Sequence, residues 1–163
     1  MAVDMFIKIK GIEGESTDKK HPKEIDVLAW SWGMSQSGTT HMGGGGGSGK
    51  VSVQDLSFTK YVDASSHALM GACCVGKHHD DAILYVRKAS GKGGDPIEYI
   101  KITMNEVMVT SVSTGGSGGE DRLTENITLN FAKVKFEYTP QKADGTKDTT
   151  KETTWDIAAN AND

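Results

Sequence analysis

A glycine-rich run that ends in lysine is the segment of this sequence that most resembles a chemical motif. Gly44 to Lys50 fits the spacing G-x-x-x-x-G-K of a phosphate-binding loop. That loop needs a Ser or Thr after the lysine to hold magnesium, and it opens a helix whose amides bind phosphate. Here Val51 follows, and the next residues alternate with the period of a strand. The sequence therefore argues against nucleotide binding and favours a loop between antiparallel strands.

A second candidate is a cluster of side chains that could bind zinc. Adjacent positions on a helix point about 100° apart, and no second ligand pair follows at the spacing of a zinc finger. We therefore expect a solvated connection from helix to strand and two small buried thiols, with a metal site as the alternative. The residues concerned are Cys73, Cys74, His78, His79, Asp80 and Asp81.

Tryptophan side chains offer a third kind of chemistry, because they could stack on the sugars of a carbohydrate ligand. Trp155 stands near the end of the chain, and two further tryptophans lie in the run 25–36. Residues two apart on a strand point to the same side, and large aromatics dominate cores. The alternation predicts one continuous strand over 25–36 whose buried side comprises Leu28, Trp30, Trp32 and Met34.

Length and charge set the broad class of the protein. With 163 residues, the chain is expected to form one domain over 1–163. The net charge of -4 argues against nucleic-acid binding, which needs a basic surface. The first residues do not resemble a signal peptide, and no apolar run approaches the ~20 residues of a membrane span. We therefore expect synthesis as a soluble protein in the cytoplasm, without a cleaved signal.

The remaining pattern predicts an all-β protein, mainly antiparallel, that forms a closed barrel or a sandwich. Alternating segments are separated by hairpin-length connections and shift phase near Ala132 and Lys133, as at a β-bulge. One short helix is expected at about 65–75, with Gly76 ending it. The segment 142–163 is polar, with a possible last strand at 153–157. The other expected strands begin or end near Met5–Lys10, Val51–Tyr61, Ala82–Lys88, Glu98–Thr114 and Leu123–Tyr138.

Several long stretches resemble the hemolysin-coregulated protein (Hcp) family. They occur in order and span most of residues 1 to about 142. The stretches are Met1–Ile9 (MAVDMFIKI), Glu24–Gly38 (EIDVLAWSWGMSQSG), Val53–Tyr61 (VQDLSFTKY) and Ser113–Asn126 (STGGSGGEDRLTEN).

This resemblance implies a function that the residues alone do not give. Members of the family are β-barrels with one helix that assemble into stacked hexameric rings, forming the inner tube of the bacterial type VI secretion system. The implied partners are further copies of the chain, the spike protein, the sheath and effector proteins in the lumen. The resemblance implies export by that system and no catalytic residues, metal or cofactor.

Within this reading, two groups of residues are candidates for contact. On the side of the strand opposite the tryptophans, the small residues Ala29, Ser31 and Gly33 are predicted to face the lumen and touch cargo, or to let a neighbouring subunit approach. Long glycine loops are costly to order, so a neighbouring subunit is expected to order them. The predicted interface or stacking residues are Gly43, Gly44, Gly45, Gly46, Gly47, Thr114, Gly115, Gly116, Ser117, Gly118, Gly119, Glu120, Asp121 and Arg122.

Overall fold

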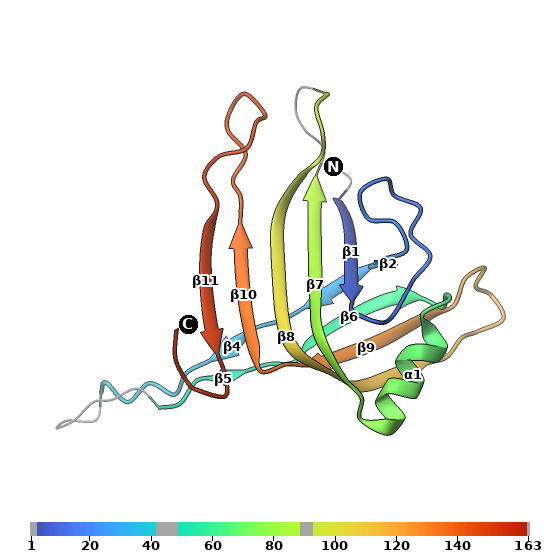
Figure 1. Cartoon of the computed structure of the whole chain (residues 1–163), viewed down its shortest axis with the longest axis horizontal. Helices are drawn as coiled ribbons and strands as arrows, with labels where there is room; N and C mark the ends of the chain where they lie inside the picture. Colours follow the sequence, from blue (N-terminus) through green and yellow to red (C-terminus); the bar gives the residue numbers. More distant parts are fainter. Residues whose placement is uncertain (1–2, 42–48, 89–92, 163) are drawn as a thin grey trace.

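The structure is a computed structural model that describes residues 3–41, 49–88 and 93–162. It is mostly antiparallel β-structure with one short helix, as the sequence predicts (Figure 1). The elements in chain order are β1 (Val3–Ile9), β2 (Ile25–Asp26), β3 (Ala29–Ser31), β4 (Met34–Ser35), β5 (Ser52–Val53), β6 (Leu56–Tyr61), α1 (Ser66–Val75), β7 (His78–Lys88), β8 (Ile97–Thr114), β9 (Thr124–Asn130), β10 (Lys133–Tyr138) and β11 (Lys151–Asp156).

The main sheet curves around so that its two end strands, β2 and β3, are consecutive in the sequence. Its strands follow the order β2-β1-β7-β8-β9-β6-β3, with neighbours antiparallel. Between β2 and β3, the Val27 amide donates to the Met5 carbonyl of β1, and the Leu28 amide donates to the Thr59 carbonyl of β6. The segment 25–31 therefore bridges the first and last long strands of the sheet.

Strand β8 is long enough to pair with two different strands along the same edge, β10 and β9. Its first half pairs with β10 through residues such as Met104, and its second half pairs with β9 through residues such as Val109. Between them, Glu106 has φ 55°, a left-handed conformation that is uncommon for a residue with a side chain. Strands β9 and β10 are separated at Phe131 and Ala132, close to the predicted change of phase.

The C-terminal segment forms the last strand that the sequence suggests, slightly earlier than expected. Strand β11 covers 151–156 rather than 153–157 and pairs with β10, and its last residue, Asp156, also forms a bridge with Ala161. The two strands stand side by side at one edge of the molecule (Figure 1).

Helix α1 begins and ends close to the predicted positions. Gly76 follows it with φ 64° and donates its amide to the Ala72 carbonyl, as a left-handed C-cap does. At the other end, Ser65 makes no side-chain cap, and the Ser66 hydroxyl accepts the Asp63 amide instead. Leu69 and Ala72 are the apolar helix residues buried in the core.

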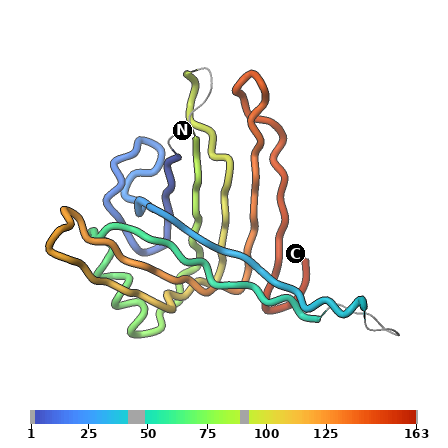
Figure 2. Tube along the Cα trace, turned by 180° about the vertical axis from the view of Figure 1, so that it is seen from behind, coloured from blue at the N-terminus to red at the C-terminus, as the bar shows by residue number. Residues whose placement is uncertain are grey.

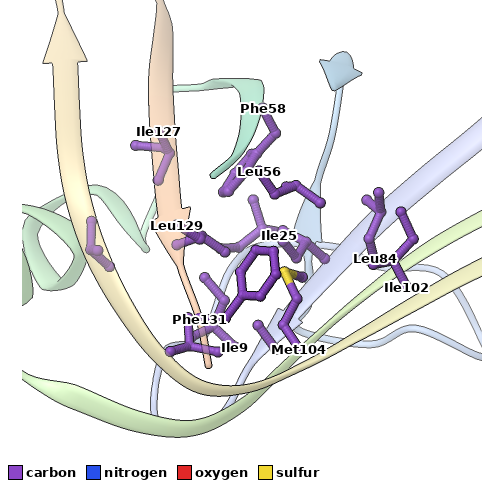
Figure 3. Packing of buried hydrophobic residues seen from close by; sticks show 14 of the residues in the cluster. Ile9, Ile25, Leu56, Phe58, Leu84, Ile102, Met104, Ile127, Leu129 and Phe131 are labelled. Carbon is purple, nitrogen blue, oxygen red and sulfur yellow. The ribbon is translucent and has the colours of Figure 1, made fainter. Parts of the chain in front are cut away.

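Ile25 lies in the middle of the core, among side chains from β1, β6, β8 and β9 (Figure 3). This position corrects the predicted burial of the run 25–36. Ile25 and Val27 are buried, whereas Leu28 is 40% exposed and Met34 is 53% exposed in the single chain. Trp30 and Trp32 are half-buried and pack against the core.

The reason for this difference is that 25–36 is not one strand. It is divided into β2, β3 and β4, which pair with three different partners: β1, β6 and β5. Each break changes which side chains face inward, so one alternation cannot describe the whole run.

Strands β4 and β5 form a short two-stranded arm that projects from one end of the body (Figure 2). They follow β3 and precede β6, so the arm continues that antiparallel pair outward. The glycines predicted to form the first interface loop, Gly43 to Gly47, lie outside the described residues.

Candidate functional site

The outer side of the sheet formed by β3, β6 and β9 carries small and hydroxyl side chains. Ser57 and Thr128 hydroxyls lie 3.3 Å apart, and the Thr59 hydroxyl donates to the Asn126 carbonyl oxygen at 2.8 Å. A shallow hollow of about 240 Å³ opens here. It is lined by Ala29, Trp30, Ser31, Ser57, Phe58, Thr59 and Asn126.

Two of the three residues predicted to face a lumen lie on this surface. Ala29 and Ser31 are exposed on β3, opposite Thr59 and Ser57 of β6. Gly33 is half-buried beyond the end of β3, where its carbonyl accepts the Gln54 amide at 2.9 Å. It therefore belongs to the base of the arm rather than to the same stretch of strand.

Sequence reasoning missed the rest of this surface. Ser57, Thr59, Asn126 and Thr128 reach it from strands that are remote in the chain. The available signal was the alternation of buried Phe58 and Ile127 with hydroxyl and amide residues on either side. That alternation predicted strands with one apolar, buried side and one polar, exposed side. It did not predict which strands would be neighbours in the sheet.

The second glycine loop is exposed throughout. Thr114 ends β8, opposite Glu125 of β9, and the loop from Gly115 to Arg122 follows it. A Cβ at Gly116 would come within 2.3 Å of the Leu123 side chain, so this position needs glycine unless Leu123 moves. The Arg122 guanidinium lies 3.8 Å from the centre of the Tyr61 ring.

Beneath this loop, a fully buried ion pair joins the sheet to the helix. The Lys60 ammonium donates to Glu125 at 2.7 Å, to Asp63 at 3.0 Å and to the Ser66 hydroxyl at 3.1 Å. The Ser66 hydroxyl in turn donates to Glu125 at 2.8 Å. The network fixes the start of α1 against β6 and β9.

Two further ionic contacts hold the segment between β1 and β2. His21 lies between carboxylates of Glu24 and Glu98, the latter at 2.7 Å, and its ring stacks on Phe6. Burial raises the pKa of Glu24. Hydrogen bonds from Arg87 lower the pKa of Asp18 to about 2.

The candidate metal ligands do not converge. In the described parts of the chain, no group of three or more His, Cys, Asp or Glu side chains is placed to hold a metal ion. His78 to Asp81 belong to β7, which corrects the expectation of a loop. Of the thiols expected to be buried, Cys73 is half-buried and Cys74 is exposed, because Cys74 lies off the helix face that packs on the core.

The other two chemical candidates also find structural roles. Lys50 and Val51 are followed by strand β5, where a phosphate-binding loop would open a helix. The Trp32 indole donates to the Gln54 carbonyl at 2.9 Å, and Trp155 lines an apolar groove beside the arm. Across the described residues, no helix is long and apolar enough to cross a membrane.

Comparison with known proteins identifies the family. A family model described as "Type VI secretion system effector, Hcp" matches residues 6–138. The chain belongs to the Hcp family. It is 69% identical over 148 residues to Protein hcp1 of Pseudomonas aeruginosa, covering 91% of this chain and 90% of that protein.

Solved structures agree with this assignment. A structure of a type six secretion system protein aligns with a TM-score of 0.91 at 30% identity, covering 99% of this chain and all of the other. Hcp1 from Salmonella typhimurium aligns with a TM-score of 0.81 at 42% identity, with 99% of each chain covered. As a member of the Hcp family, the chain is a type VI secretion tube protein with the family's β-rich fold.

Proposed function

We propose that this chain folds as one domain over 1–163 and assembles into hexameric rings that stack as the inner tube of the type VI secretion system. The spike protein caps this tube, and the contractile sheath surrounds it. Synthesis takes place in the bacterial cytoplasm. The assembled tube leaves the cell through the system itself, without a cleaved signal peptide.

The observation that carries this proposal is the family match over residues 6–138, together with high identity to Protein hcp1 over nearly the whole chain. The exposed glycine loop from Gly115 to Arg122 supports it, because ordering such a loop against a neighbouring subunit explains a sequence that is costly to order alone.

We assign the hydroxyl-bearing surface of β3, β6 and β9 to the lumen. Its side chains are short and uncharged, so a protein cargo meets a wall without bulk or strong charge. Effector proteins carried by the tube contact Ala29 and Ser31 on this surface. The role is structural and transporting, without catalysis or a cofactor.

Native mass spectrometry tests the assembly. The expected mass is that of a hexamer at micromolar concentration in low and moderate salt. A protein that stays monomeric at high concentration contradicts the proposal, and a monomer that binds glycans favours the carbohydrate-binding alternative.

Substitution of Ser31 tests the lumen assignment. Ser31→Gln is expected to leave rings intact and equally stable to heat, while co-purification of at least one effector decreases. Gly71→Gln is the control, because it adds the same side chain at a helix position with open space around its Cβ. Rings that dissociate with Ser31→Gln place this residue at a subunit contact, and intact rings with unchanged effector binding remove its role in cargo contact.

A further inference from the structure

The connection between β1 and β2 comprises residues 10–24 and forms a compact loop beside these strands (Figure 1). We refer to it as the strap. Phe6 of β1 and Tyr85 of β7 are partners in that strand pair, next to Ile7 and Leu84 of the main core. Because side chains alternate along a strand, Phe6 and Tyr85 lie on the side that faces away from the core. Phe6 is nevertheless only 5% exposed, because the strap covers it.

His21 is the strap residue that covers this side of the sheet. Its ring stacks on Phe6 with the ring centres 4.6 Å apart, and it lies at the same distance from the ring of Tyr85. The side chain is 4% exposed. Its Nδ1 contacts the carboxylate of Glu24, and its Nε2 lies 2.7 Å from the carboxylate of Glu98. Since Glu24 belongs to the strap and Glu98 to β8, these contacts join the strap to the sheet.

A buried histidine between two carboxylates cannot satisfy both contacts when all three groups have lost their protons. Neutral imidazole has one N–H donor and one acceptor nitrogen, whereas an ionised carboxylate only accepts. One ring nitrogen would then place its lone pair against a carboxylate oxygen. A single additional proton, on His21 or on Glu24, removes this conflict. Burial raises the pKa of Glu24, which favours keeping that proton within the cluster.

The other titratable and charged groups around the cluster do not remove its need for a proton. Tyr85 stays neutral, because burial raises its pKa to about 12. The Arg87 guanidinium is paired with Asp18 of the strap. Lys8 favours the ionised form of Glu24, but burial outweighs this effect. The surrounding groups from β1, β7, β8 and the strap are Asp4, Lys8, Asp18, Asp81, Tyr85, Arg87 and Lys101.

We propose that the strap is a pH-sensitive latch, held closed by one proton that His21, Glu24 and Glu98 share. The closed strap binds this proton more tightly than the open strap does, so closure is favoured while the proton is present and is lost as the pH rises through its release. Two carboxylates then remain against a neutral ring, and the strap opens and uncovers Phe6 and Tyr85. The latch is a property of the single chain, and it does not depend on the proposed assembly.

The second ionic contact of the strap has the opposite pH dependence. Arg87 holds the pKa of Asp18 at about 2, so their pairing is lost only as the pH falls toward that value. Raising the pH therefore leaves this contact in place and acts on the histidine cluster alone. The strap is expected to open locally around His21 and Glu24, while the sheet beneath it stays folded.

Hydrogen exchange of the protein in its native assembly, measured by mass spectrometry from about pH 6 to about pH 9, tests the latch. The amides of Gly14, Ser16 and Lys23 report on the strap, because they form hydrogen bonds within it. After correction for the intrinsic pH dependence of exchange, protection of strap peptides is expected to fall about tenfold or more over this range. Release of one proton limits the fall to about tenfold per pH unit. Peptides around buried Leu84 are the internal reference and are expected to keep their protection.

Two variants separate a proton latch from ordinary packing. In Glu98→Gln, the new amide can donate to the unprotonated ring nitrogen, so the closed strap no longer needs the additional proton. Protection of its strap is expected to stay high and to vary by less than about threefold with pH. His21→Gln removes the titrating ring and is expected to give weaker protection that does not change over the same range. Glu152→Gln is the matched control, since this exposed carboxylate pairs with Lys135 on the β10–β11 hairpin.

A loss of strap protection with rising pH that Glu98→Gln abolishes and Glu152→Gln retains supports the latch. Constant protection of the unsubstituted strap overturns it, as does the same pH dependence in Glu98→Gln or in His21→Gln. An equal loss in the peptides around Leu84 indicates global unfolding and also overturns a local latch. The melting temperature and the mass of the assembly, measured for each variant, show whether it folds and assembles like the unsubstituted protein.

Discussion

The body of this protein and its β4–β5 arm are built from the same kind of strand, but they differ in what stabilises them. In the body, β1 pairs with β7 over seven positions, and the apolar side chains meet in one cluster (Figure 3). In the arm, two pairs of residues meet and Met34 is largely exposed. The comparison teaches that long strand pairings and a common apolar core hold the body, whereas the described part of the arm has few contacts of its own.

The largest test of this comparison is to break the buried ion pair of the body. Lys60→Met is expected to lower the free energy of unfolding by about 3–5 kcal/mol, because Glu125 would remain buried without its cation. Chemical denaturation of the protein under conditions that favour monomers measures the change.

A double variant separates lost charge pairing from lost packing. Lys60→Met with Glu125→Leu removes both buried charges and is expected to recover most of the stability. A single Lys60→Met variant as stable as the unsubstituted protein would mean that the network contributes little to the body.

Trp32 lies where the body meets the arm, so its substitution is expected to have an intermediate effect. Because the side chain is half-buried, Trp32→Ala is expected to cost about 1–3 kcal/mol of unfolding free energy, less than full burial would give. Trp32→Phe is the control that keeps the ring near Phe131. An unchanged melting temperature for Trp32→Ala would show that the ring does not pack on the body in solution.

The pH dependence of unfolding tests the ionic contacts that stabilise the body and that the arm lacks among the described residues. Arg87 lowers the pKa of Asp18 from 3.8 to about 2 in the folded chain. A lowered pKa contributes stability that is present above pH 3.8 and is lost as the pH falls through about 2. Asp18→Asn is therefore expected to be less stable near neutral pH and to lose less stability over that acidic window.

The matched measurement uses the arm. Lys50→Gln is expected to leave the acid dependence of unfolding unchanged, because Lys50 makes no ion pair among the described residues. Equal pH dependence in Asp18→Asn and the unsubstituted protein would rule out a stabilising role for the Arg87 contact.

The smallest expected effect on folding belongs to the arm itself. Met34→Ser is expected to change the unfolding free energy of the monomer by less than about 0.5 kcal/mol, as exposed positions usually do. The same substitution at buried Met104 is the contrasting control and is expected to destabilise strongly. A large loss of monomer stability with Met34→Ser would show that the arm is part of the folded body.

The family resemblance and much of the fold could be read from local sequence. Alternation over 98–114 predicts the strand that the structure has as Ile97–Thr114, because each strand residue places its side chain on a side fixed by its neighbours. The end of the helix follows in the same way from Gly76, which adopts a left-handed conformation there. These features depend on residues that are close in the chain.

What the sequence could not give depends on contacts between distant residues. Leu28 and Ile25 exchange their expected places because 25–36 pairs with three different strands, and nothing within the run specifies those partners. For the same reason, the hydroxyl surface could not be predicted. It forms because β6 pairs with β3, which carries Ser31, and with β9, which carries Thr128.

The buried Lys60 shows most clearly which features only tertiary structure decides. As a sequence feature, this lysine resembles any solvent-facing charge on a strand. Its burial is tolerable only because Glu125, 65 positions away, is placed beside it by the pairing of β6 with β9. The sequence by itself thus determined most of the strands, the helix and the family, while tertiary packing decided how the run 25–36 is divided and which charges and apolar side chains are buried.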